Sequence, residues 1–350
     1  MPTNRRSALR GALAALTITA LAATGAASAA LAQNTGQDAP QDLPTVRLGL
    51  LKFGTVNWEA RTIQEEGLDE ANGFRLEIVP YAGGDATMLA LRGGEVDVTT
   101  GDWLDASRGR ASGEDITFVP YSTAIGAVMA PCESDIETID DLKGKSIGVA
   151  GGPLDKSWLM LQGLAARGGE DGTGGFDLVA EVEPVYGAPP LLAEKLRQGE
   201  LDATLNYWHY NARLEADGYC RVTDAQIAAE ELGASGPIPA VGYLFKQSWA
   251  DANPALASGF VAASRGAKEV LAQSDEAWER LRPMMKADDD AAFRTLRERF
   301  VEGIPSTDYA RSEADTKVIY DFLAEAGGEK LVGSANDMAP GTYWSGLGGS

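Results

Sequence analysis

Apolar and polar positions along the chain follow two different periods. Stretches with apolar residues at every third or fourth position are typical of helices packed on one face, and beyond the middle of the chain this period continues over residues 247–330. Short apolar runs typical of buried strands lie at residues 46–51, 76–79, 146–150 and 180–185. Alternation of such strands with helices predicts an α/β fold with mainly parallel sheets flanked by helices, followed by a helical C-terminal third.

The sequence also contains an internal repeat. Residues 91–103 read LRGGEVDVTTGDW and residues 196–208 read LRQGELDATLNYW, with seven identities in thirteen positions at an offset of 105. In both copies the pattern predicts an amphipathic helix that ends at a glycine, then a short strand, then a loop that carries a tryptophan. The elements before each copy occur in the same order, so we predict two similar halves.

Two similar α/β halves predict where a ligand binds. In open α/β sheets, the loops at the carboxyl ends of the strands form the ligand crevice. Two such sheets that face each other would make a cleft, to which each half contributes the same kind of loop. Binding side chains are therefore expected in these loops.

Four of the seven tryptophans fall in the predicted loops, at equivalent positions of the two halves. These four are Trp58, Trp103, Trp158 and Trp208, and the tyrosines at neighbouring positions are Tyr81, Tyr121, Tyr186, Tyr207 and Tyr210. One hypothesis is an aromatic box that closes on one small ligand from both sides. The alternative is that each tryptophan packs beneath its own loop, and the sequence leaves both open.

Polar side chains accompany the aromatic ones. The candidate ligand contacts among them are Asn57, Asp102, Asp155, Lys156, Ser157, Asn206 and His209. Asp155 precedes a predicted helix and suits an N-cap better than a ligand contact. Asp102 has no helical pattern after it that demands a cap, so it is a stronger candidate. Free N–H groups at helix starts suit an anion, whereas carboxylates beside tryptophans suit a cation, so the charge of the ligand stays open.

The first 32 residues have the features of an export signal. Three arginines precede an uncharged apolar run that ends in the small-residue pattern Ala30-Leu31-Ala32. We predict a signal peptide over residues 1–32, cleaved after Ala32, and a mature protein in the periplasm. A transmembrane helix is the alternative, disfavoured by the alanine-rich run. Arg5 and Arg6 resemble a twin-arginine signal, although a general secretion signal also fits.

Export to an oxidising compartment changes the interpretation of Cys132 and Cys220, since two cysteines in an exported chain more often pair than stay free. A bridge between them would close a long loop and stabilise the fold by about 4 kcal/mol in the chain-entropy model. Two unpaired thiols remain the alternative, because the sequence does not show whether the two residues come within reach.

Composition and charge exclude several classes of function. Thirty Lys and Arg against 51 Asp and Glu give a net charge of −21, which argues against a protein that holds nucleic acid by neutralising phosphates. One histidine and two cysteines are too few for a typical zinc site. Ser146 fits a G-x-S-x-G pattern, but it precedes a strand instead of lying on a strand-to-helix turn. We therefore predict no cofactor, no metal and no catalytic residues.

The chain resembles the periplasmic solute-binding proteins of nitrate/sulfonate/taurine-type ABC transporters. The segments that carry the resemblance are VRLGLLKFG, GEVDVTTGDW, VPYSTAIGAVM, DLKGKSIGVAGGP and VYGAPPLLAEKLRQGELDATLNYW. The resemblance implies a type II-like periplasmic binding fold of two lobes joined by two hinge crossings. Carried onto this chain, one lobe comprises residues 45–130 and 238–350, and the other comprises residues 131–237. The crossings would follow Ala130 and precede Val241.

The resemblance also implies a function. It predicts a monomeric substrate-binding component that captures a small organic solute and delivers it to an ABC permease in the inner membrane. Relatives bind nitrate, alkylsulfonates, taurine or pyrimidine-type vitamin precursors. Anion binders imply a basic residue in the cleft, for which Lys52 and Lys156 are the candidates, so a simple inorganic anion is disfavoured and the aromatic loops favour an organic ligand.

Two other classes of function remain as alternatives. One is a sensory binding protein that feeds no transporter. The other is an enzyme on the same fold, but relatives that make a thiamine pyrimidine use a cysteine-rich motif that this chain, with its two distant cysteines, lacks.

Overall fold

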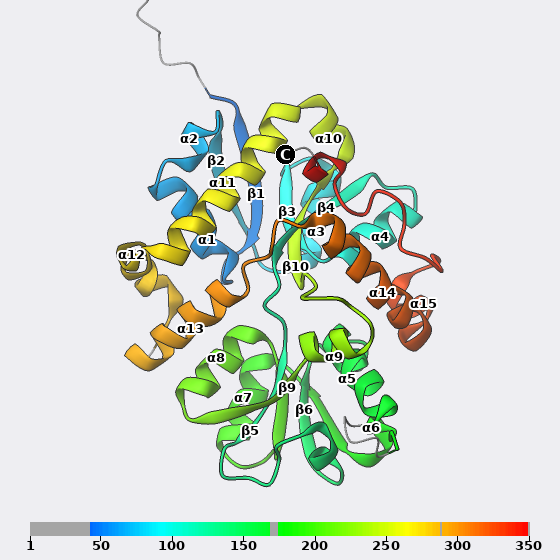
Figure 1. Cartoon of the computed structure of the whole chain (residues 1–350). Helices are drawn as coiled ribbons and strands as arrows, with labels where there is room; N and C mark the ends of the chain where they lie inside the picture. The colour runs from blue at the N-terminus through cyan, green and yellow to red at the C-terminus, as the bar shows by residue number, and fades with distance from the viewer. Residues whose placement is uncertain (1–42, 169–173, 288, 349–350) are drawn as a thin grey trace, which may run out of the picture. The chain divides into compact units, whose positions relative to one another are not determined.

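Two five-stranded sheets organise the chain (Figure 1). The computed structural model describes residues 43–168, 174–287 and 289–348, so the predicted signal peptide over residues 1–32 lies outside the described residues. The strands of the first sheet, in spatial order, are β2 (Arg75–Tyr81), β1 (Thr45–Leu51), β3 (Val98–Gly101), β10 (Val241–Lys246) and β4 (Ile116–Ser122). The strands of the second are β7 (Glu183–Gly187), β6 (Ser146–Ala150), β8 (Ala203–Asn206), β5 (Ala127–Pro131) and β9 (Tyr219–Asp224).

The two sheets share one plan. β1 pairs in parallel with β2 and β3, and β6 pairs in parallel with β7 and β8. In each sheet the fourth strand, β10 or β5, runs antiparallel to both of its neighbours. The sheets are therefore mixed, with one reversed strand in each, and the predicted two similar α/β halves are confirmed.

Helices connect and cover the strands (Figure 1). Those of the first half are α1 (Val56–Glu65), α2 (Leu68–Ala71), α3 (Gly84–Gly93) and α4 (Trp103–Ala111). Those of the second half are α5 (Lys156–Arg167), α6 (Leu178–Glu181), α7 (Pro189–Arg197), α8 (Trp208–Ala216) and α9 (Ala225–Glu231). The predicted helical third contains α10 (Gln247–Ala252), α11 (Pro254–Gln273), α12 (Asp275–Met285), α13 (Asp290–Glu302), α14 (Tyr309–Gly327) and α15 (Glu329–Val332).

The chain passes twice between the sheets. β4 belongs to the first sheet and β5 to the second, so the first crossing occupies residues 123–126 and precedes Val128. The expectation that this crossing follows Ala130 is wrong, because the apolar run 127–130 resembles the end of the preceding strand but forms β5 of the second sheet. The second crossing occupies residues 232–240 and precedes Val241, as expected. We call the first sheet with its helices, including α10 to α15, the first lobe, and residues 127–231 the second lobe.

The repeated aspartate ties neighbouring strands together in both lobes. Asp97 Oδ2 accepts a hydrogen bond from the backbone N–H of Arg47 at 2.8 Å, at the start of β1. Asp202 Oδ2 accepts the equivalent bond from Ser146 at 2.7 Å, at the start of β6. A carboxylate that accepts a backbone N–H forms one of the stronger hydrogen bonds of proteins. The aspartate that is repeated at positions 97 and 202 therefore stabilises the sheet of each lobe.

The repeated threonine does the same one step further along. Thr99 donates its hydroxyl to the carbonyl of Gly49 at 2.9 Å, and Thr204 donates to that of Gly148 at 3.2 Å. A Cβ at Gly148 would meet Leu201 at 2.8 Å, and a Cβ at Gly49 would meet a neighbouring valine at 3.2 Å. A Cβ would thus crowd a core side chain at both equivalent positions, more closely at Gly148 than at Gly49, and glycine avoids this contact.

Two further features concern export and stability. Cys132 and Cys220 form a disulfide with a Cα–Cα distance of 4.8 Å, which joins the chain beyond β5 to the adjacent β9. Across the residues that the structure describes, none of the helices combines the length and the apolar character needed to cross a membrane.

Candidate functional site: a cavity between the lobes

The repeated tryptophans begin helices. Trp103 is the first residue of α4 and Trp208 the first residue of α8, and a single residue separates each from the short strand of its repeat. The sequence predicted loops here. The reason for the error is that α4 buries small residues such as Ala106, Ser107 and Gly109, so its period is weak in the sequence.

Asp102 caps the helix that the sequence did not reveal. Its carboxylate accepts from the backbone N–H of Asp105 at 3.1 Å, and the Asp105 carboxylate accepts from the N–H of Asp102 at 3.1 Å. This reciprocal pair is a capping box. The expectation that Asp102 needs no capping role was therefore wrong. Asp155 caps α5 as predicted, by accepting from the N–H of Trp158 at 3.2 Å.

Lys156 of the second lobe is bound to Asp102 of the first. The Lys156 ammonium lies 2.6 Å from Asp102 Oδ2, 3.3 Å from the carbonyl of Ala240 and 5.2 Å from the ring centre of Trp103. Burial alone would raise the pKa of Asp102, but Lys156 and the helix N–H of Asp105 outweigh it and hold that pKa below its ordinary value. Lys156 therefore links the lobes, and its charge is already compensated.

The four loop tryptophans separate into two groups. Trp58 and Trp208, from different lobes, meet edge to face with ring centres 6.0 Å apart. Trp103 and Trp158 are fully buried in another hydrophobic cluster, where Trp103 Nε1 donates to the carbonyl of Pro239 at 3.0 Å. Packing beneath their own loops, the alternative left open by the sequence, describes Trp103 and Trp158. An aromatic box shared by the two lobes is therefore limited to Trp58 and Trp208.

A cavity of about 500 Å³ opens beside this tryptophan pair and is lined from both lobes. The first lobe contributes the loop after β1, the start of α1 and the end of α12, and the second lobe contributes α8. Its lining residues are Lys52, Phe53, Gly54, Thr55, Asn57, Trp58, His209, Tyr210, Arg213, Met284, Met285 and Lys286. We call it the inter-lobe cavity.

Basic groups dominate the polar part of this lining. Lys52, Arg213 and Lys286 are the charged residues among the described lining residues, and none of those is an Asp or a Glu. Lys286 lies 4.2 Å from the ring centre of Phe53, which is 74% exposed. Lys286 is also the one described residue other than glycine with a positive φ, at 51°. Such a backbone is unfavourable for a residue with a Cβ and persists where surrounding structure requires it.

Arg213 and His209 form the wall from the second lobe. Arg213 donates to the carbonyl of His209 at 2.5 Å and to the carbonyl of Met285 at 2.9 Å, so it bridges α8 to the end of α12. Burial, and to a smaller extent the charge of Arg213, lower the pKa of His209 from 6.5 to about 4. His209 is therefore neutral at pH 7.

The loop of the first lobe is held by its own side chain. Asn57 donates its amide group to the carbonyls of Leu51 and Gly54, each at 3.0 Å, which fixes the turn between β1 and α1. Asn57, Trp58 and His209 are predicted contacts that line the cavity, as do Tyr210 and Lys52, which the sequence named as an aromatic and a basic candidate. The other predicted contacts, which do not line it, are Tyr81, Asp102, Trp103, Tyr121, Asp155, Lys156, Ser157, Trp158, Tyr186, Asn206 and Trp208.

Several of those side chains have structural partners instead. Asn206 is buried and donates its amide to the carbonyl of Pro189 at 2.9 Å. Tyr121 is buried in the first lobe, 5.4 Å from Tyr243 between ring centres. Tyr186 is 42% exposed at the end of β7. All three lie within or at the end of a strand, not in a loop, and their side chains serve packing or solvent contact.

The sequence missed one wall of the cavity entirely. Met284, Met285 and Lys286 end α12, a helix outside the repeat, and Arg213 lies within α8 rather than in a loop. No periodic signal connects these residues to the strand ends. Within the described ranges, no group of three or more His, Cys, Asp or Glu side chains is placed to hold a metal ion.

Comparison with known proteins identifies relatives of this architecture. The family model described as NMT1/THI5 like matches residues 62–277. The periplasmic aliphatic sulphonate binding protein SsuA from Escherichia coli is 17% identical, with a TM-score of 0.65 over 87% of this chain and 98% of that chain. No curated protein matches the chain significantly.

Two further solved structures have the same fold. The alkanesulfonate-binding protein SsuA from Xanthomonas axonopodis pv. citri, bound to MOPS, is 18% identical, with a TM-score of 0.59 over 87% of this chain and 99% of that chain. An ABC transporter protein from Parabacteroides distasonis is 10% identical, with a TM-score of 0.65 over 85% of this chain and 98% of that chain.

Proposed function

This chain belongs to the NMT1/THI5-like family and has a two-lobed periplasmic-binding-protein-like fold, and from this premise we propose that it is the extracytoplasmic substrate-binding component of an ABC importer. Its solute is an amphipathic organic anion, with a sulfonate as the best match, held in the inter-lobe cavity and delivered to a membrane permease. The observation that carries this proposal is a cavity lined from both lobes by basic side chains on one hand and aromatic and thioether groups on the other.

The basic lining supports an anion. The whole chain carries 51 acidic against 30 basic residues, so a lining with Lys52, Arg213 and Lys286 departs from the rest of the molecule. Cationic side chains in a confined space attract and orient an anionic group. Lys156, the other basic candidate from the sequence, is already paired with Asp102. Two of the solved relatives are named for sulfonate binding, which agrees with this charge.

The apolar lining supports an organic ligand. Phe53, Trp58, Tyr210, Met284 and Met285 present aromatic rings and thioethers to the same space. Ligand pockets of about 300–1,000 Å³ are typical for small organic molecules, and the inter-lobe cavity lies in this range. Methionine side chains also adapt their shape to flexible chains. An inorganic anion would leave this apolar surface without a partner.

The placement between lobes supports transport by closure. A ligand that contacts α8 and the loop after β1 together favours the conformation in which both are close. Arg213 already bridges α8 and α12 in that conformation. The disulfide is the kind of bond that forms in an oxidising compartment such as the periplasm. Transport rather than catalysis is further supported by His209, because a base with a pKa of about 4 is a weak proton acceptor at neutral pH.

The test uses the mature chain and titration calorimetry with hexanesulfonate, with hexanol as the uncharged control ligand. We expect hexanesulfonate to bind and hexanol to bind far more weakly. Lys286→Ala and Lys52→Ala should each weaken hexanesulfonate binding by about tenfold, since each removes a charge that faces the ligand.

The matched control is Lys330→Ala, which removes the same charge from an exposed position on α15, away from the cavity. It should bind hexanesulfonate like the unaltered chain. Equal losses in all three lysine variants would contradict the proposed site, because the effect would then come from net charge alone. Absence of sulfonate binding would contradict the proposed ligand class.

A further inference from the structure

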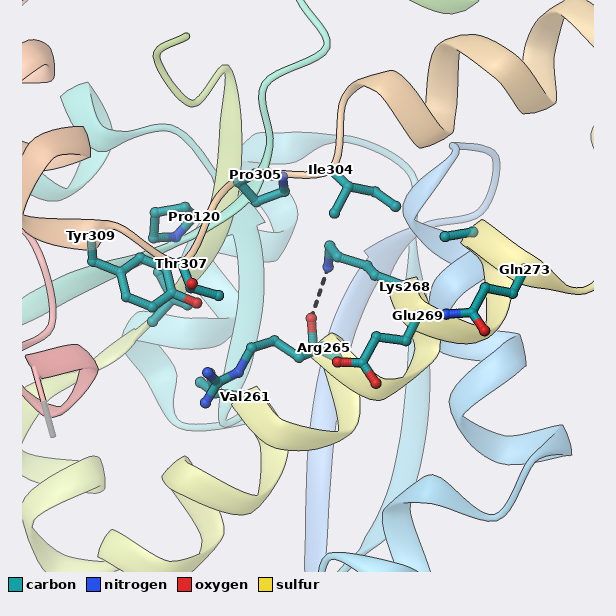
Figure 2. A pocket seen from close by; sticks show the side chains of 13 residues that line it. Pro120, Val261, Arg265, Lys268, Glu269, Gln273, Ile304, Pro305, Thr307 and Tyr309 are labelled. Carbon is teal, nitrogen blue, oxygen red and sulfur yellow. Dashed lines mark hydrogen bonds between the residues drawn. The ribbon is translucent and has the colours of Figure 1, made fainter. Parts of the chain in front are cut away.

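A second cavity, of about 190 Å³, lies within the first lobe (Figure 2). It opens between the last turns of α11, the middle of β4 and the segment 304–309, which links α13 to α14. We call it the α11 pocket. Its lining residues are Val119, Pro120, Val261, Ser264, Arg265, Lys268, Glu269, Ala272, Gln273, Ile304, Pro305, Thr307 and Tyr309. None of them belongs to the second lobe, so this pocket is separate from the inter-lobe cavity.

Lys268, which lines the α11 pocket, belongs to a buried ion pair with Glu59. Glu59 of α1 is 0% exposed and Lys268 is 6% exposed, and the Lys268 ammonium donates to Glu59 Oε2. Glu59 also accepts from the hydroxyls of Tyr243 at 2.7 Å and Ser264 at 2.6 Å. Burying such a pair costs desolvation energy that packed apolar residues would avoid, so a buried pair is weak evidence for a role in stability. Stability alone therefore does not account for the Glu59–Lys268 pair, and a role in binding is the alternative.

The carboxylate of this pair accepts three hydrogen bonds, whereas the ammonium donates two of its three N–H groups to acceptors among the described residues. Lys268 has three N–H groups, of which one is donated to Glu59 and one to the Ser264 hydroxyl at 2.9 Å. Figure 2 shows its side chain reaching in among the lining residues, with the second of these bonds dashed. The third N–H can point to the ring of Tyr121, whose centre lies 4.3 Å from Nζ, or donate to an acceptor bound in the pocket. An anionic oxygen is the stronger partner of the two.

The remaining walls define the rest of a ligand. Arg265 lies one turn from Lys268 and takes part in no ion pair within the described part of the chain, so its guanidinium is available to a carboxylate. Val119, Val261 and Ile304 are apolar and face the same space, as do two prolines. The pocket thus joins two cationic donors to a small apolar chamber.

We propose that the α11 pocket is a second binding site, for a small organic carboxylate with a compact apolar body. The carboxylate bridges Arg265 and the third N–H of Lys268, and the apolar body fills the space among the valines and Ile304. A single negative charge fits best, because Glu59 already compensates Lys268 and Glu269 adds a negative charge to the lining. Phosphate and other compact dianions lack both the charge match and the apolar contact.

The test is calorimetric titration of the mature chain with benzoate, with benzamide as the neutral molecule of the same shape. We expect benzoate to bind and benzamide to bind at least about tenfold more weakly, because a charge-assisted hydrogen bond is lost. Arg265→Gln should weaken benzoate binding by about tenfold. Val261→Phe and Ile304→Phe fill the chamber and should each abolish binding, with thermal unfolding curves that show an intact fold.

Lys286→Ala separates this site from the inter-lobe cavity and should leave benzoate binding unchanged. Loss of benzoate binding in that variant would place benzoate between the lobes and overturn the second site. Benzoate binding that survives both filling variants, equal affinity for benzamide, or no benzoate binding up to its solubility would overturn it as well. Failure of hexanesulfonate to bind would contradict the proposed transport ligand and leave the α11 pocket standing.

Discussion

The same strand-and-helix unit occurs once in each lobe, and the two copies differ in the surroundings of their tryptophan. In both, an aspartate and a threonine tie the short strand to its parallel neighbour, and a tryptophan begins the following helix. Trp103 is 0% exposed and packs against Tyr320 of α14, with ring centres 6.3 Å apart. Trp208 is half-buried and packs against Trp58 beside the inter-lobe cavity. The residues that are identical in the two copies therefore stabilise the fold. Whether the tryptophan lies in the core or beside the cavity depends on the segments that pack against it.

The C-terminal helices create this difference. α14 supplies Tyr320 against Trp103 and lies beside α5, so the core cluster that holds Trp103 and Trp158 continues through α14. On the other side α13 lies beside α8, and Arg299 of α13 bonds to Glu215 of α8 at 2.7 Å. There the end of α12 leaves room for the inter-lobe cavity. The C-terminal helices, which have no counterpart in the repeat, bury Trp103 but leave a cavity beside Trp208. The two similar lobes therefore differ at these equivalent positions.

The largest expected effect separates the two tryptophans. Trp103→Ala removes a fully buried ring and its hydrogen bond to Pro239, and should lower the free energy of unfolding by about 3–5 kcal/mol. Trp208→Ala removes a half-buried ring and should cost about 1–2 kcal/mol. Trp208→Ala should instead weaken hexanesulfonate binding, because Trp58 loses its support at the cavity wall. Urea unfolding and calorimetry measure the two quantities.

Trp103→Phe is the control for the first variant, because it keeps an aromatic ring and should recover most of the lost stability. Equal stability losses in Trp103→Ala and Trp208→Ala would contradict the division between a structural and a site-facing tryptophan. So would an unchanged sulfonate affinity in Trp208→Ala.

The next effect concerns the repeated aspartates, which differ in their additional partners. Asp97 also binds the Arg47 side chain at 2.6 Å and 3.0 Å, whereas Asp202 binds the hydroxyl of Ser146 at 2.7 Å. Asp97→Ala should lower the free energy of unfolding by about 2–3 kcal/mol, and Asp202→Ala by about 1–2 kcal/mol, since each leaves a strand N–H without its charged acceptor. Neither should change hexanesulfonate affinity. A change in affinity without loss of stability would show that the aspartates serve the ligand.

Most of the helices and strands could be predicted from the sequence because short stretches of residues determine them. The apolar runs at β1 and β6 and the glycine that ends α3 each carry a short-range signal. The reversed strand in each sheet carries none, because β5 and β10 look like any buried strand and their direction depends on the crossing. The first crossing was misplaced for the same reason.

The site was less predictable because it depends on segments outside the repeat. Asn57, Trp58 and His209 follow from the rule that ligands bind at the carboxyl ends of strands. Met285 and Lys286 lie at the end of α12, and only the folded chain brings them to α8. The ion pair between Asp102 and Lys156 was missed because the two residues lie 54 positions apart, in different lobes.

The smallest expected effect comes from the residue that follows each tryptophan. At equivalent positions the first copy has Leu104, which is buried, and the second has His209, whose pKa is lowered from 6.5 to about 4. The unfolded chain therefore takes up a proton at this residue before the folded chain does. This contribution to stability is complete above pH 6.5 and is lost as the pH falls toward 4.

His209→Leu places in the second lobe the residue type found at the equivalent position of the first. It should remove the contribution of His209 to the pH dependence of stability. Between pH 8 and pH 5 the unaltered chain should lose about 1–2 kcal/mol more in the free energy of unfolding than the variant. Urea unfolding at both pH values measures the difference, and the single histidine of the chain makes the assignment unambiguous. The carboxylates titrate equally in both proteins and cancel. An equal loss in both would mean that His209 is as accessible to protons in the folded chain as in the unfolded one, and the second lobe would then be no more pH-sensitive at this position than the first.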